Sequence, residues 1–115
     1  MIELTAEPTA ADIDLVTVLA ALAEPVRMTY VQALSRTTTA TRCGEVLKDT
    51  SITISKSTLS HHLRVLREAG VTHTEVYGSY RFVSLRRDDL ETRFPGLLNA
   101  VCNTNSLMER VPLSV

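Results

Sequence analysis

The 115-residue sequence predicts a mainly α-helical domain that carries one small β-hairpin. In several segments apolar residues recur every three or four positions, which is the helical period. Between them, "VTHTEV" and "YRFVSL" are β-branched and aromatic runs separated by "YGS", which is typical of a hairpin around Gly78. The expected helices are residues 12–23, 24–36, a short 43–49, 55–70 and 86–101. The predicted order is therefore α-α-α-α-β-β-α.

The first two helices are expected from their starts as well as their apolar stripes. Asp12 is the expected N-cap of the first helix, and Pro25 occupies the first position of the second, where its missing N–H costs nothing. The predicted inner positions are Ile13, Val16, Leu19 or Ala20 and Ala23 in the first helix, and Val26, Tyr30, Val31 and Leu34 in the second.

The last helix has an apolar stripe that a proline interrupts. Asp88 and Glu91 have the spacing of a capping box, and Pro95 is expected to kink or split the helix. The chain is expected to form a single domain, residues 1–115, with its core at about 12–102 and a frayed tail at 103–115. The predicted stripe consists of Leu90, Phe94, Leu97, Leu98 and Val101.

Composition limits the classes of protein that the chain can represent. A hydrophobic content of 44% with 22% charged residues is ordinary for a globular protein. No apolar run reaches the ~18 to 20 residues of a membrane span, and the acidic N-terminus is unlike a signal peptide. Two cysteines, Cys43 and Cys102, do not make a disulfide framework. We therefore expect a cytoplasmic protein with reduced thiols.

The net charge of −1 conceals an uneven distribution of charge. Residues 1–24 contain five acidic residues and no Lys or Arg. Residues 55–87 contain six Lys or Arg and two Glu, which gives 6 − 2 = +4, and all three histidines as well. A local basic surface is what contact with phosphate groups requires.

The segment "SKSTLSHHLRVLREAG", residues 55–70, is an amphipathic helix with clear boundaries. Ser55 is its expected N-cap, Ile54 can pack on Leu59 as a hydrophobic staple, and Gly70 provides the C-terminal stop. At 100° per residue the leucines Leu59, Leu63 and Leu66 share the inner face. The opposite face carries Ser57, Ser60, His61, Arg64 and Glu68.

That outer face has the chemistry of a DNA-binding helix. Short side chains at the start allow close entry into a major groove, and Arg64 can reach a guanine edge or a phosphate. His62 lies beside the leucines and is expected to be partly buried with a satisfied hydrogen bond. Because adjacent side chains diverge by about 100° on a helix, His61 and His62 are not expected to share a metal ion. Three helices followed by a hairpin make a winged helix-turn-helix, with one extra helix at each end.

At this point a family resemblance becomes clear. From about Leu19 to Leu98 the chain resembles the ArsR/SmtB bacterial repressors. The resemblance is to the start of their winged-helix domain in "ALAEPVRMTYVQAL", and to their recognition helix and wing in "SKSTLSHHLRVLREAGVTHTEVYGSYRFVSL". The resemblance implies a homodimeric repressor that binds an inverted-repeat DNA operator and dimerises through its terminal helices. It implies DNA contacts at Lys56, Ser57, Thr58, Ser60, His61, Arg64, Tyr77, Ser79 and Arg81. The implied dimer contacts are Ile13, Val16, Leu90, Phe94, Leu97, Leu98 and Val101.

The sequence departs from the sensor sites of that family. "TRCGEVL" keeps one cysteine, Cys43, of the family's cysteine pair, and the last helix has no histidine. We therefore expect no metal site and no cofactor. A thiol sensor that uses Cys43 and Cys102 stays an alternative, as does a winged-helix interaction module without DNA binding. An enzyme is not expected, since no phosphate loop, dinucleotide fingerprint or nucleophile elbow is present.

Overall fold

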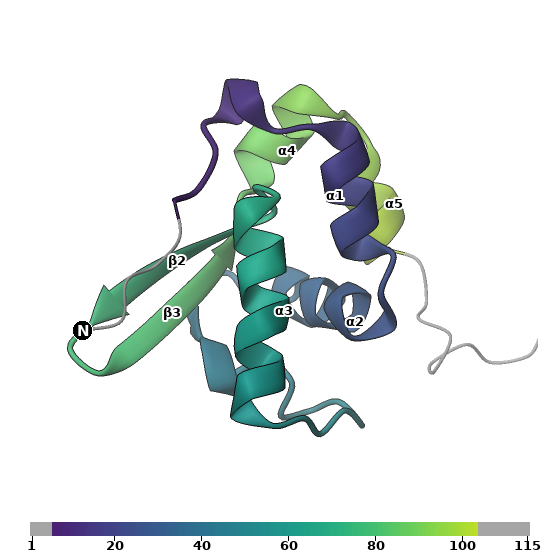
Figure 1. Cartoon of the computed structure of the whole chain (residues 1–115). Coiled ribbons are helices and arrows are strands. Elements are labelled where there is room, and N and C mark those ends of the chain that lie inside the picture. The colour runs from purple at the N-terminus through teal and green to yellow at the C-terminus, as the bar shows by residue number, and fades with distance from the viewer. Residues whose placement is uncertain (1–5, 104–115) are drawn as a thin grey trace, which may run out of the picture.

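A computed structural model describes residues 6–103 and confirms the mainly helical architecture with a hairpin (Figure 1). The α-helices are α1 (Leu15–Leu22), α2 (Pro25–Ser35), α3 (Lys56–Glu68), α4 (Arg87–Arg93) and α5 (Leu97–Cys102). The strands are β1 (Thr41–Arg42), β2 (Thr72–Tyr77) and β3 (Tyr80–Leu85), and short 3₁₀ turns cover Ala10–Asp12 and Cys43–Glu45.

The hairpin belongs to a three-stranded antiparallel sheet of order β1-β3-β2. In the predicted hairpin, Thr72 pairs with Leu85 at the base and Tyr77 with Tyr80 at the tip. The turn between them uses Gly78 at φ +62°, a left-handed conformation that glycine adopts without strain. The sequence did not predict β1, because two residues are too few to display a strand period.

Helix α1 begins later than its sequence suggests, so its inner face differs from the prediction. The N-cap is Asp14, whose carboxylate accepts the Thr17 N–H at 3.0 Å, whereas Asp12 closes the preceding 3₁₀ turn. The residues of α1 that are buried are Val18, Ala21 and Leu22. The inner positions predicted at Val16, Leu19, Ala20 and Ala23 are therefore wrong, and these residues are exposed.

Helix α2 follows its prediction more closely. Pro25 is its first residue, and the Glu24 carboxylate before it accepts the Arg27 N–H at 2.9 Å. Tyr30, Val31 and Leu34 are buried as predicted. The expected short helix at 43–49 is only a 3₁₀ turn followed by further turns.

The end of α3 is closed by Gly70 at φ +86°. The Val71 N–H donates to the Leu66 carbonyl at 3.0 Å, which terminates the helix with a bond from beyond its end. A Cβ at position 70 would lie 2.7 Å from the Ile13 side chain. This glycine therefore lets the 3₁₀ turn before α1 pack closely against the junction of α3 and β2.

The C-terminal helix splits where the sequence predicted. Helix α4 ends at Arg93, and α5 begins at Leu97 after Pro95 and Gly96. The capping box of Asp88 and Glu91 is wrong: position 86 is the N-cap and no side chain caps the helix there. Of the expected frayed tail, residues 104–115 lie outside the described part of the chain.

Candidate nucleic-acid interface

The outer face of α3 is open to solvent along its whole length. Figure 1 shows α3 running lengthwise across the domain beside the β2–β3 hairpin. Every α3 residue predicted to contact DNA is exposed: Lys56, Ser57, Thr58, Ser60, His61 and Arg64. Arg64 makes no hydrogen bond or ion pair with any residue between 6 and 103. Its guanidinium is therefore available to an external partner.

The start of α3 gathers three hydroxyl groups around one cap. Ser55 Oγ accepts the Thr58 N–H at 3.2 Å, as predicted, and lies 3.0 Å from Thr58 Oγ1 and 3.2 Å from Ser57 Oγ. Helix N-termini present unpaired N–H groups and a positive dipole end. Together these groups form a surface suited to phosphate oxygens.

The inner face of α3 fixes the helix on the core. Leu63 and Leu66 are buried, and Leu59 is partly buried against the core beside Ile54. His62 is also buried and accepts a hydrogen bond at Nδ1 from Arg27 Nη1 of α2 at 3.1 Å, because a guanidinium has no acceptor. This confirms the expected burial and hydrogen bond of His62.

Arg27 and His62 form a hydrogen bond between α2 and α3. Burial lowers the pKa of His62, with Arg27 and His61 adding to the effect and the Glu24 carboxylate opposing it. The imidazole is accordingly neutral at physiological pH, with its proton on Nε2. Arg27 Nε also donates to the Ala21 carbonyl at 2.6 Å, so one side chain links α1, α2 and α3.

The wing, residues 72–85, presents aromatic side chains at its tip. Tyr77 and Tyr80 are exposed, as is Val76, and Ser79 lies in the turn between the strands. Tyr77 packs edge-on against Phe82, with ring centroids 5.7 Å apart. Arg42 of β1 stacks over the Tyr80 ring at 4.3 Å, a cation–π contact that could not be predicted from sequence patterns. Arg81, the predicted wing cation, is half-buried.

The two cysteines are free and differ in exposure. Cys43 is buried and Cys102 is half-buried. Burial raises the pKa of the Cys43 thiol, although Arg81 and Arg67 oppose the shift. A raised pKa keeps the sulfur as an unreactive thiol. The electrostatic environment of Cys43 therefore does not favour sensing chemistry in this conformation.

An apolar surface remains on the terminal helices. Leu15, Val16 and Leu19 of α1 are exposed, Val16 by 73%. Two residues predicted at a dimer interface, Ile13 and Leu90, are instead fully buried in the core of the single chain, so this expectation is corrected. The other predicted residues are half-buried: Phe94, Leu97, Leu98 and Val101.

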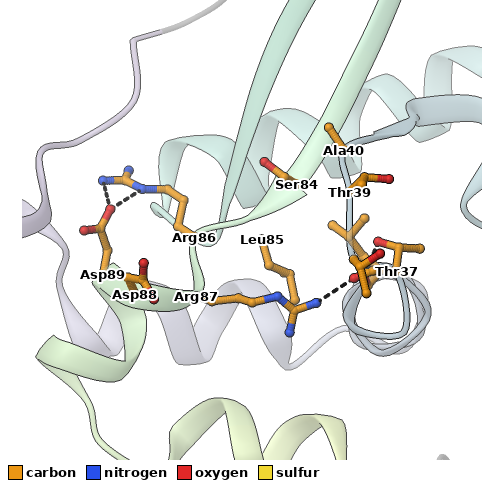
Figure 2. A pocket seen from close by; sticks show the side chains of 11 residues that line it. Thr37, Thr39, Ala40, Ser84, Leu85, Arg86, Arg87, Asp88 and Asp89 are labelled. Atoms are coloured by element: carbon orange, nitrogen blue, oxygen red, sulfur yellow. Dashed lines mark hydrogen bonds and ion pairs between the residues drawn. The ribbon is translucent and has the colours of Figure 1, made fainter.

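A cavity of about 440 Å³ lies apart from α3, between the loop after α2 and the start of α4 (Figure 2). Arg87 Nη2 donates to the Ser35 and Thr37 carbonyls at 2.9 and 3.0 Å. Arg86 extends in another direction and pairs with Asp89 at 2.9 Å. Arg87 thus fastens the start of α4 to the end of α2, whereas Arg86 pairs within the first turn of α4.

The described residues contain neither a cluster of metal ligands nor a membrane-spanning helix. Between residues 6 and 103, no three His, Cys, Asp or Glu side chains are grouped so that they could hold a metal ion. In the same range no helix has the length and apolarity to cross a bilayer.

The exposed α3 and the hairpin beside it define a winged helix-turn-helix of the DNA-binding kind. The model of the family described as "Bacterial regulatory protein, arsR family" matches residues 50–73. The chain is 36% identical over 81 residues to the uncharacterized HTH-type transcriptional regulator YceK of Bacillus subtilis (strain 168), covering 70% of this chain and 79% of that relative. The protein belongs to the ArsR family of transcriptional regulators.

A solved structure agrees with this assignment. The crystal structure of the transcriptional repressor BigR from Xylella fastidiosa matches with a TM-score of 0.59 and 29% sequence identity, covering 77% of this chain and 83% of that one. The predicted fold class and family are therefore confirmed.

Proposed function

We propose that the protein is a homodimeric repressor that binds an inverted-repeat operator through α3 and the wing. The observation that carries this proposal is the outer face of α3, which is capped, exposed and ends in an uncommitted guanidinium at Arg64. A transcription factor of this kind acts in the bacterial cytoplasm, where the chromosome is. The family describes regulators and not enzymes, which supports a binding function without catalysis.

The exposed groups divide into two roles. Lys56 and the hydroxyls of Ser57, Thr58 and Ser60 suit phosphate oxygens, because they surround the helix N-terminus. His61 and Arg64 lie one turn further along and suit base edges in the major groove. The wing would contact the flanking backbone through Tyr77, Ser79 and Arg81.

A homodimer would place two such helices on successive major grooves. Half-sites one helical turn apart, about 34 Å, require a two-fold arrangement of recognition helices. Apolar residues of α1, of α5 and of the junction between α4 and α5 supply a surface for that contact: Val16, Phe94, Leu97, Leu98 and Val101. Exposed apolar groups on terminal helices are better explained by a partner than by solvent.

Val16→Glu tests the dimer with little risk to the fold. Because Val16 is 73% exposed in the single chain, a charge there is tolerated in a monomer but would be buried in the proposed interface. Light scattering should give the dimer mass for the original chain and the monomer mass for the variant. Thr17→Glu, next to it on α1 but outside the predicted contacts, is the matched control. A variant that remains dimeric would remove α1 from the interface.

The DNA proposal is tested with a labelled duplex from the region upstream of the protein's own gene. Fluorescence anisotropy should give tight binding at low salt, with log K falling linearly as log[salt] rises. A winged-helix interaction module, the alternative, predicts no binding to any duplex even at low salt. The outer face of α3 disfavours that alternative, since it remains polar and basic.

A further inference from the structure

The first described residues form an arm that is bound to the edge of the sheet. This arm, residues 6–9, precedes the 3₁₀ turn and approaches β2 (Figure 1). The Glu7 carboxylate accepts the Thr74 N–H at 3.1 Å, and the Pro8 carbonyl accepts a hydrogen bond from Arg86 Nη1 at 2.7 Å. Since β2 is an edge strand, its outward N–H groups need such partners. The arm is thus part of the wing's structure.

His73 connects the arm to the wing through both of its ring nitrogens. Nδ1 lies 2.8 and 3.1 Å from the two Glu7 oxygens, and Nε2 lies 3.0 Å from Glu75 Oε1. Ionised carboxylates only accept hydrogen bonds, so both contacts are satisfied only when both nitrogens carry a proton. The geometry therefore selects the imidazolium. Consistently, the Glu7 hydrogen bond, with help from Glu75, raises the pKa of His73.

The connection continues to the tip of the wing. The Tyr77 hydroxyl donates to the second oxygen of Glu75, so the order of contacts is arm, His73, Glu75, Tyr77. Tyr77 is exposed and is one of the residues assigned above to the DNA backbone. A chemical change at His73 can therefore reach a DNA-contacting side chain.

The charged groups that surround His73 come from the arm, from β2 and from α3, and not from β3. Glu7 approaches from the arm and Glu75 from β2, whereas Ser84, opposite His73 on β3, is uncharged. Arg67 of α3 interacts electrostatically with Glu7. Arg86, which follows β3, donates a hydrogen bond to the arm. The His73 cluster itself, Glu7 with His73 and Glu75, carries −2 + 1 = −1 when the imidazole is protonated and −2 when it is neutral.

We propose that His73 is a positioning residue for DNA binding: its imidazolium joins the arm to the wing and holds Glu75 and Tyr77 in place, and operator affinity falls as it loses its proton. The inference rests on the proposed DNA binding and adds its regulation by pH. A neutral imidazole can donate to one carboxylate only. The Glu75 side chain is 47% exposed and that of Glu7 21%, so water replaces the Glu75 contact first. Glu75, the partner of Tyr77, is then no longer held in place by His73. The net charge of the His73 cluster also becomes more negative by one, which repels the DNA phosphates.

The first experiment follows His73 directly in the free protein. An NMR titration of the imidazole should give a pKa above the ordinary histidine value of about 6.5. Glu7→Gln and Glu75→Gln should each lower it, and Asp49→Asn, which removes an exposed carboxylate elsewhere, should leave it unchanged. An ordinary pKa that does not respond to Glu7 or Glu75 would overturn the inference without reference to DNA.

The second experiment measures operator affinity between pH 6 and 8.5 at constant salt. Because an exposed ion pair contributes only a small interaction free energy, the His73-dependent fall in operator affinity should be roughly two- to fivefold. His73→Gln should lose that part of the fall, and Asp49→Asn, which removes an exposed carboxylate outside α3 and the wing, should retain it. Amide NMR spectra check that each variant is folded. If His73→Gln binds with the same pH profile as the original chain, the inference fails while the proposed function stands. If no chain binds DNA at pH 6, the proposed function fails first.

Discussion

Two histidines in this domain have opposite electrostatic environments. One is a neutral residue in the contact between α2 and α3, and the other is a charged residue in the contact between the arm and the wing. His62, between α2 and α3, is buried and faces the Arg27 guanidinium, so its pKa is lowered and it is a neutral acceptor. His73, between the arm and the wing, faces two carboxylates, so its pKa is raised. The recognition helix is thus held by packing and a neutral hydrogen bond. The contact between the arm and the wing is ionic, and it weakens when His73 loses its proton.

Truncating the packing of α3 should have the largest effect on stability. Leu66 is fully buried, so Leu66→Ala should lower the free energy of unfolding by about 2–5 kcal/mol. Urea denaturation followed by circular dichroism measures this. Leu15→Ala, at an exposed leucine of α1, is the matched control and should change stability much less. A loss below about 1 kcal/mol at Leu66 would contradict the view that packing fixes α3.

Removing the partner of His62 should have the next largest effect. Arg27→Met keeps the length of the side chain but leaves a buried acceptor unpaired, which costs about 1–3 kcal/mol. The same denaturation measurement, repeated with His62→Phe in the Arg27→Met background, should recover part of the loss because the unpaired acceptor is then gone. If Arg27→Met is neutral, the contact does not join the two helices.

The pH dependence of stability should show the two histidines with opposite signs. His73 has a folded pKa above its unfolded value of about 6.5, so its contribution is complete below pH 6.5 and is lost as pH rises through the folded pKa. Because its side chain is 44% exposed, solvent screening limits this contribution to less than about 1 kcal/mol. His62 has a folded pKa below 6.5, so it lowers stability as pH falls from 6.5 through that pKa.

Thermal melts from pH 5 to 9 can separate these two contributions. Relative to the original chain, His73→Gln should lose stability mainly at the acidic end and match it at the alkaline end. The opposite ordering, with the larger loss at high pH, would mean that His73 does not act as a cation between Glu7 and Glu75.

The sequence was most informative where local chemistry decides the structure. Ser55, Gly70, Gly78 and Pro95 have the roles that their residue types predicted, because caps, turns and helix breaks depend on a few neighbouring atoms. The face of α3 was also predictable, since three leucines at helical spacing leave only one orientation.

The features that the sequence did not reveal depend on contacts between distant segments. The bond from Glu7 to His73 joins residues 66 positions apart, and Arg42 reaches Tyr80 only because β1 pairs with β3. The start of α1 was misplaced because Asp12 and Asp14 are both suitable caps. A shift of two residues turned the expected inner face outward, which exposed Val16.

The most direct test of the account is the operator affinity of Arg64→Ala, compared with Arg36→Ala, which removes one cation outside α3 and the wing. Affinities are measured by anisotropy titration on the preferred duplex and on a scrambled duplex. If the guanidinium contacts a base edge, Arg64→Ala should weaken the binding free energy by about 1–3 kcal/mol, mostly on the preferred sequence. Arg36→Ala should bind almost as tightly as the original chain. Unchanged affinity and unchanged sequence preference in Arg64→Ala would contradict the assignment of the outer face of α3 to DNA.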